Sequence, residues 1–195
     1  MAPKKAPKAE DSTGDLELLP TPTLDSQSLR MSYRIARGEQ GVLTFEPYKS
    51  ILLPMWRFKT VAIAEKSSKE LKTAFDGYVK RDDFVGADMA RKFIQMGMTR
   101  AKRYANHKGG KKYDRSARVV EKDGGKSVEL PKSDAHDGRD EKLQASEIFK
   151  AAWKQCTSDG RYIELKNEFL AEQKIWDKEH KAMKVKTEVK QEVAD

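Results

Sequence analysis

The sequence predicts a mainly α-helical protein: one small domain of about four helices, with a short β element near its N-terminal side. Three observations support this fold class. Apolar residues recur at intervals of three and four over long stretches, which is the spacing of an amphipathic helix. Residues that cap helices stand just before several of these stretches. A chain of 195 residues, 37% hydrophobic and 36% charged, suits one domain with polar segments outside its core.

Residues 1–28 are predicted to form a disordered N-terminal tail. They combine lysines, acids, four prolines and hydroxyl residues with few large apolar side chains. Such a composition cannot bury enough apolar surface to offset the entropy that is lost on ordering. The predicted domain occupies residues 29–182, and residues 183–195, beyond the last apolar stripe, are expected to form a disordered or frayed C-terminal tail.

The predicted β element lies between residues 33 and 45. Short apolar segments there flank the turn-rich stretch 37–41, a pattern typical of two extended segments around a glycine-containing loop. Pro47 and Pro54 then bracket a segment that is too short for more than one or two helical turns.

The first two helices are predicted over about residues 60–80 and 83–107. Thr60 is a suitable N-cap for the first helix, and an aspartate, Asp82 or Asp83, opens the second. Both helices have one apolar face; that of the second consists of Ala90, Ile94, Gly97, Ala101 and Tyr104.

The remaining two helices follow a long polar segment. Residues 115–140 are rich in glycine, serine and charged residues, and they are predicted to form a long surface loop. The third helix is expected over about residues 140–156, and the fourth begins near Arg161.

Positive charge is concentrated at the end of the second helix. From Arg100 to Arg118 there are eight basic residues and one acid, Asp114, so +7 of the formal charge of +8 lies in this segment. Lysine and arginine supply charge and hydrogen-bond donors for phosphate, and the pair Gly109–Gly110, expected to end the helix, lets backbone N–H groups approach closely. The sequence therefore predicts nucleic acid or another phosphate-bearing ligand as the partner.

The predicted contacts come from the face of the second helix opposite its apolar stripe and from the glycine-containing segment after it. The phosphate contacts are Arg91, Lys92, Arg100, Lys102, Arg103, Lys108, Lys111 and Lys112. Asn106 and His107 add neutral hydrogen-bonding groups, and Tyr113 or Tyr104 would stack on bases. In an alternative interpretation the cations only complement the dipole of a solvated helix end, at about 0.3–1 kcal/mol each. Tyr104 would then belong to the core.

Two other classes of function stay open. In one, a small enzyme acts on a phosphorylated substrate, with His107 as acid or base and Glu39, Glu46 or Asp88 positioning a water or a metal. In the other, the protein is an adaptor whose fourth helix presents an apolar edge around Trp176, unless that tryptophan packs on its own domain.

No motif in the sequence requires a catalytic residue, a cofactor or a metal. The phosphate-binding loop, HExxH and GxSxG patterns are absent from it. Cys156, the one cysteine, continues the apolar face of the third helix and leaves no internal disulfide or cysteine-based metal site.

Without a long apolar segment or a secretory signal, the chain is predicted to be intracellular, in the nucleus or cytoplasm, and to avoid membranes. The oligomeric state does not follow from the sequence.

Several runs of the sequence resemble one known family. They are residues 37–44, 46–50, 56–60, 83–113, 148–153 and 162–170. They resemble the family known as domain of unknown function 4385, over about residues 30–175. Within this resemblance most of residues 115–140 is an insertion, and Met55 stands where many members carry histidine. The resemblance implies the extent of a domain and no particular activity.

Overall fold

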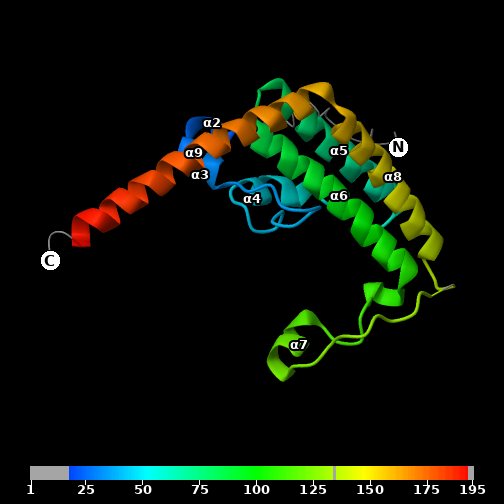
Figure 1. Cartoon of the computed structure of the whole chain (residues 1–195). Coiled ribbons are helices and arrows are strands. Elements are labelled where there is room, and N and C mark those ends of the chain that lie inside the picture. Colours follow the sequence, from blue (N-terminus) through cyan, green and yellow to red (C-terminus); the bar gives the residue numbers. More distant parts are fainter. Residues whose placement is uncertain (1–17, 134, 193–195) are drawn as a thin grey trace, which may run out of the picture.

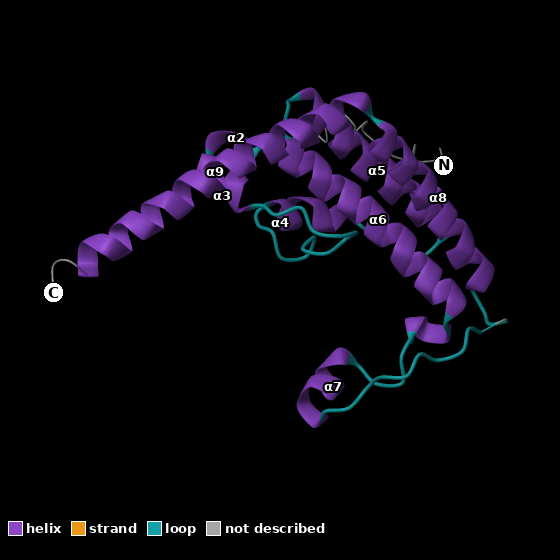
Figure 2. Cartoon of the chain, viewed as in Figure 1, coloured by secondary structure: helices purple, strands orange, loops and turns teal. Residues whose placement is uncertain are grey.

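The computed structural model describes residues 18–133 and 135–192 (Figure 1). Within these residues there are eight α-helices, two short 3-10 helices and no β-strand (Figure 2). The mainly α-helical class is confirmed. In chain order the elements are α2 (Pro22–Asp25), α3 (Gln27–Ser32), α4 (Tyr48–Leu52), η1 (Leu53–Met55), α5 (Val61–Lys80), α6 (Phe84–Asn106), η2 (Lys108–Gly110), α7 (Ala117–Asp123), α8 (Arg139–Ser158) and α9 (Gly160–Glu192).

Three long helices, α5, α6 and α8, pack against one another and enclose the core (Figure 1). The N-terminal part of α9 lies across them and contacts all three, and its C-terminal part continues away from the bundle. The short helix α4 packs on α6 as well. Because α6 has neighbours on so many sides, nearly all of its residues from Phe84 to Gly97 are buried.

The four predicted helices are present close to their predicted bounds. The Thr60 side chain accepts the Ile63 N–H at the start of α5, and the Asp83 side chain accepts the Gly86 N–H at the start of α6. Each cap satisfies a backbone donor that the first helical turn leaves unpaired. The apolar stripe of α5 is fully buried, as its spacing predicted; it consists of Ala64, Leu71, Phe75 and Tyr78. The helix count exceeds four because short helices form in the N-terminal region and in the segment after α6.

The predicted β element is wrong. Residues 37–44 instead form consecutive turns, in which the N–H groups of Gln40, Val42 and Thr44 each donate to the carbonyl three residues earlier. These local bonds satisfy much of the backbone, so the segment needs no partner strand. Val42 still reaches the core and is 3% exposed, whereas Leu43 is exposed to solvent.

Part of the region that composition assigns to an N-terminal tail is held against the bundle. Thr23 is buried, and its Oγ1 donates to the buried Asp83 carboxylate over 2.9 Å. Arg81 donates to the backbone carbonyl of Leu19 over 2.5 Å. Composition missed this order because a few hydrogen bonds to fixed groups do not depend on apolar content. The rest of the predicted tail, residues 1–17, lies outside the described residues.

At the other end of the chain, α9 is helical as far as Glu192. The predicted C-terminal tail therefore begins as a continuation of this helix, and residues 193–195 lie outside the described residues. Within residues 18–133 and 135–192, none of the helices combines the length and apolar character needed to cross a lipid bilayer.

Residues 111–133 form an arm that projects from the bundle beyond the end of α6 (Figure 1). Two backbone hydrogen bonds join its sides: Asp114 N–H donates to Val128 over 3.0 Å, and Leu130 N–H donates to Lys112 over 2.9 Å. The helix α7 lies at its tip. None of the described side chains of the arm is buried, and the arm carries a helix, α7, that the sequence did not indicate.

Candidate nucleic-acid interface

The C-terminal end of α6 brings the predicted basic residues to the base of the arm. The helix ends at Asn106, with His107 as an extended C-cap. The sequence predicted that the glycine pair ends α6, but the helix ends before it. Gly109 and Gly110 instead belong to the next turn, η2, with φ of 65° and 69°. A Cβ at Gly110 would lie 2.6 Å from the Tyr104 ring, so this position requires glycine for its space as well as for its backbone angle.

Protein donors cover several carbonyl groups around this helix end. The Ser133 N–H donates to the Asn106 carbonyl over 2.8 Å, and His136 Nε2 lies 3.0 Å from the Tyr104 carbonyl oxygen. Arg103 Nε donates to the Gly110 carbonyl over 2.6 Å. Carbonyls at a helix C-terminus carry partial negative charge and repel anions. Their coverage reduces this repulsion where the positive side chains are concentrated.

A pocket of about 590 Å³ lies between this end of α6 and the arm, and we call it the basic pocket. Five cationic and two anionic side chains line it together with neutral polar ones. The cations are Arg100, Lys102, Arg103, Lys112 and Lys132, the acids are Glu39 and Glu129, and the neutral groups are Thr99, Asn106 and His107. Positive charge therefore exceeds negative charge on its walls.

Most of the cations in this region have no carboxylate partner in the described part of the chain. Among the described residues, the basic side chains of 100–118 form one ion pair, in which Lys112 Nζ lies 3.5 Å from Glu129 Oε2. Of the two acids in the basic pocket, Glu39 accepts a hydrogen bond from the Thr99 hydroxyl. The positive charge that the sequence concentrates here is thus largely uncompensated by the fold.

His107 is buried in the wall of the basic pocket, with 4% of its surface exposed. Its Nδ1 is buried and has no hydrogen-bond partner among the described residues.

The three carboxylates considered for acid–base chemistry are not brought together: Glu39 lines the basic pocket, Glu46 pairs with a neighbouring lysine, and Asp88 lies in the core. No group of three or more His, Cys, Asp or Glu side chains that could hold a metal occurs in the described part of the chain.

The two tyrosines predicted to stack on bases lie in different places. Tyr113 belongs to the arm, is 40% exposed, and has Lys112 Nζ 5.2 Å from its ring centre. Tyr104 is 38% exposed, but its ring packs edge-on against Phe58 at 5.7 Å and lines an apolar groove rather than the basic pocket. Tyr113 therefore accompanies the basic residues, and Tyr104 does not.

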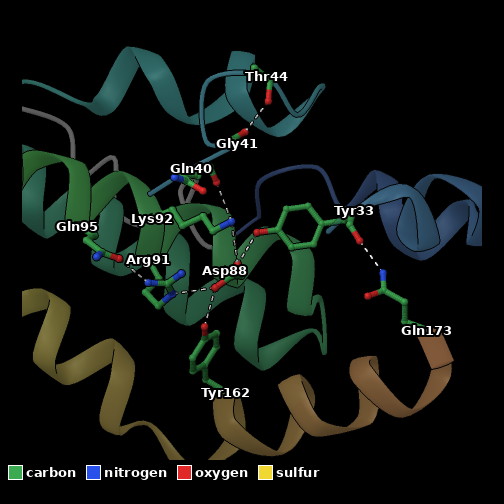
Figure 3. A network of polar contacts seen from close by, with 10 residues as sticks. All are labelled: Tyr33, Gln40, Gly41, Thr44, Asp88, Arg91, Lys92, Gln95, Tyr162 and Gln173. Atoms are coloured by element: carbon green, nitrogen blue, oxygen red, sulfur yellow. Dashed lines mark hydrogen bonds and ion pairs between the residues drawn. The ribbon is translucent and has the colours of Figure 1, made fainter. Parts of the chain in front are cut away.

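Arg91 and Lys92 do not face outward, and this part of the prediction is wrong. They are only 8% and 0% exposed. Their helical spacing does place them opposite part of the apolar stripe, but residues 33–40 and α9 cover that side of α6 (Figure 3). They are thus separated from the exposed cations of the basic pocket.

Instead, these two cations belong to a buried network around Asp88 (Figure 3). The Asp88 carboxylate accepts hydrogen bonds from the hydroxyls of Tyr33 and Tyr162 and, over 2.8 Å, from Arg91 Nε; Lys92 Nζ lies 3.7 Å away. Burial opposes ionisation of Asp88, but the charges of Arg91 and Lys92 outweigh it and hold its pKa below the ordinary value. Burial, followed by the Asp88 charge, raises the pKa of both tyrosines, so their hydroxyls stay protonated donors.

The two pocket residues that sequence reasoning missed, Lys132 and Glu129, reach the basic pocket from the arm. Nothing in the local sequence distinguishes them from other surface charges. Glu39, which the sequence suggested only as a partner for His107 in an enzyme, reaches the basic pocket from the turns before α4. Asp88 did carry a signal, because it sits in an otherwise apolar stretch with cations three and four residues later, the spacing of neighbours on a helix.

Comparison with known proteins agrees with the resemblance seen in the sequence. No curated protein and no solved structure matches the chain. A family model matches residues 17–172, a range that includes α2 to α8, the arm and the first part of α9. Since this range is most of its length, the chain belongs to the family described as domain of unknown function (DUF4385).

Proposed function

We propose that this protein binds nucleic acid through its phosphate backbone, at the basic pocket and along the adjoining arm. The observation that carries the proposal is the excess of cationic side chains around the basic pocket, most of them without carboxylate partners among the described residues. Uncompensated lysine and arginine side chains on one surface attract polyanions, because binding releases the counterions condensed on the phosphates.

The extent of the positive surface favours a polymer over a single phosphate group. Exposed cations continue beyond the basic pocket, on η2 and on the arm: Lys108, Lys111, Arg115 and Arg118. One phosphate is bound by a few converging donors, whereas successive phosphates of a strand are bound by cations spread along a surface. Tyr113, half exposed beside Lys112, adds an aromatic face on which a base can stack.

The two alternative functions have less support. His107 lines the basic pocket, but its Nδ1 has no hydrogen-bond partner among the described residues, so an acid–base mechanism lacks the group that would orient the ring. Trp176 packs partly buried against the core and stacks on His180 at 3.8 Å. An adaptor surface centred on this tryptophan is therefore not favoured.

Binding to labelled single- and double-stranded DNA and RNA, measured by fluorescence anisotropy over a range of salt concentrations, tests the proposal. If about four to six phosphates of a duplex are contacted, log K against log salt should have a slope of about −3.5 to −5.5. A slope near zero, or no binding to any of the four polymers, contradicts the proposal. Binding of a mononucleotide with equal affinity would indicate a small phosphorylated ligand instead.

A matched pair of variants locates the interface. Charge reversal of the exposed Lys102, Lys108 and Lys111 to glutamate should weaken binding by about a hundredfold or more and flatten the salt slope by about three. The control reverses three exposed lysines elsewhere, Lys69, Lys154 and Lys174, and changes the net charge equally. Equal loss of binding in both variants would show that only total charge matters and that the basic pocket is not the interface.

A further inference from the structure

We infer that a second site, separate from the basic pocket, binds a small organic anion between α6, α8 and α9. A pocket of about 400 Å³ lies there, and we call it the Arg91 pocket. Polar side chains on its walls include Arg91, Gln95 and Lys166, and a tryptophan, Trp153, provides a broad aromatic surface. The volume lies in the range of small-molecule sites.

The charge around the Arg91 pocket favours an anion. Asp88 is the acidic residue among the side chains that line it, and Arg91 and Lys166 are the cationic ones. Lys92 adds a further buried cation behind the wall, 3.7 Å from Asp88. Arg91 and Lys92 share the Asp88 carboxylate, so the two buried cations exceed the one buried acid. A positive charge in excess inside a protein is costly, and a bound anion would offset it.

Arg91 is prepared to hold such an anion. A guanidinium group carries five N–H donors in a fixed planar arrangement that matches the oxygens of a carboxylate or phosphate. In the structure, Nε donates to Asp88 and one terminal nitrogen donates to Gln95 Oε1 over 2.8 Å, which uses two of these donors (Figure 3). These bonds fix the orientation of the group before a ligand arrives, which lowers the entropy lost on binding.

The remaining walls indicate the body of the ligand. Ile35, Trp153 and Ile163 contribute apolar surface to the pocket. The chemical class is thus a small apolar or aromatic molecule that carries one oxyanion group, carboxylate or phosphate.

Titration of the full-length protein with benzoate, phenyl phosphate and neutral benzyl alcohol tests this inference. Binding is followed by ligand-detected NMR and by quenching of tryptophan fluorescence, and a Trp153→Phe variant assigns the quenching to this pocket. We expect saturable binding of at least one anion below about 10 mM and none of the alcohol. The anion that binds more tightly distinguishes a carboxylate from a phosphate site. If neither anion saturates, or if the alcohol binds equally well, the inference is wrong.

Two substitutions and one control place the anion. Lys166→Gln, at a partly exposed position, should weaken binding several-fold, and Arg91→Lys, which keeps the charge but loses the planar donors, should weaken it about tenfold. Lys174→Gln, further along α9 and exposed, should leave the affinity unchanged. If Lys166→Gln binds the anion as tightly as the parent protein, the site lies elsewhere. This result decides the question even if Arg91→Lys fails to fold. None of these residues lines the basic pocket, so nucleic-acid binding succeeds or fails independently.

Discussion

Asp88 is a charged residue with 1% of its surface exposed, and it is surrounded by side chains from three parts of the chain. An isolated carboxylate in such a place would be unstable, since transfer of a charge out of water costs several kcal/mol even after relaxation. Arg91 and Lys92 neutralise it, and Tyr33 and Tyr162 complete its hydrogen bonding. The network thereby joins Tyr33, at the end of α3, to α6 and α9.

We predict that Asp88→Asn lowers the free energy of unfolding by about 3–5 kcal/mol, because it leaves Arg91 and Lys92 as unneutralised buried cations. Urea denaturation measures the change. Asp177→Asn is the control: Asp177 also pairs with an arginine, but its side chain is 49% exposed, so the loss should stay below about 1 kcal/mol. Equal effects of the two substitutions would mean that the buried cations relax into solvent.

The same residue predicts how stability depends on pH. Because the pKa of Asp88 is lower in the folded protein than its ordinary value of about 3.9, the unfolded chain takes up this proton first as the pH falls. The contribution of Asp88 to stability is present above about pH 4 and is lost as the pH falls through the folded pKa. Urea midpoints should therefore decline more steeply below about pH 4 in the parent protein than in Asp88→Asn.

Parallel curves for the two proteins would contradict this assignment. Other carboxyls with lowered pKa, such as Asp114 and Asp177, are present in both and do not distinguish them.

Among the elements, α6 and α8 are in close contact at a glycine of α6. A Cβ at Gly97 would lie 2.6 Å from the Phe149 ring, which is shorter than any ordinary carbon contact. Phe149 is fully buried, so it has little room to move away. The spacing of the apolar stripe predicted that Gly97 faces the core; which ring it would meet depends on the register between the helices.

Gly97→Ala should lower the free energy of unfolding by about 1–3 kcal/mol, although alanine is the better helix former by about 1 kcal/mol. The double variant with Phe149→Leu should show a favourable coupling energy, because the smaller side chain relieves the overlap. Gly160→Ala is the control, since nothing lies within 4 Å of a Cβ at that position and no loss is expected. A stabilising Gly97→Ala would show that the helices separate freely.

For the molecule as a whole, the arm is a surface extension rather than part of the core. The two sides of its base are joined by the hydrogen bonds between residues 112–114 and 128–130, and described side chains beyond this base are not buried. Stability and the proposed nucleic-acid binding therefore depend on different parts of the structure. The helical bundle provides the stability, and the arm with the end of α6 provides the surface proposed to bind nucleic acid.

Replacement of residues 115–127 by Asn-Gly, a two-residue turn suited to joining antiparallel segments, tests this separation. The free energy of unfolding should change by less than about 1 kcal/mol, since little apolar surface is lost. Affinity for nucleic acid should fall, because Arg115, Arg118 and neighbouring cations are removed. A large loss of stability would show that the arm is part of the folding unit.

The sequence by itself determined the helical class, the family, the caps at Thr60 and Asp83, and the concentration of positive charge after Arg100. These properties depend on residues near one another in the chain, where spacing and capping chemistry act directly. Only the tertiary structure decided that Thr23 is held by Asp83, that Arg91 and Lys92 are buried around Asp88, and that Lys132 joins the basic pocket. The side of a helix opposite its apolar stripe can be solvated or covered by other segments, and its own spacing does not distinguish the two. That choice depends on contacts between distant residues, which a local pattern does not contain.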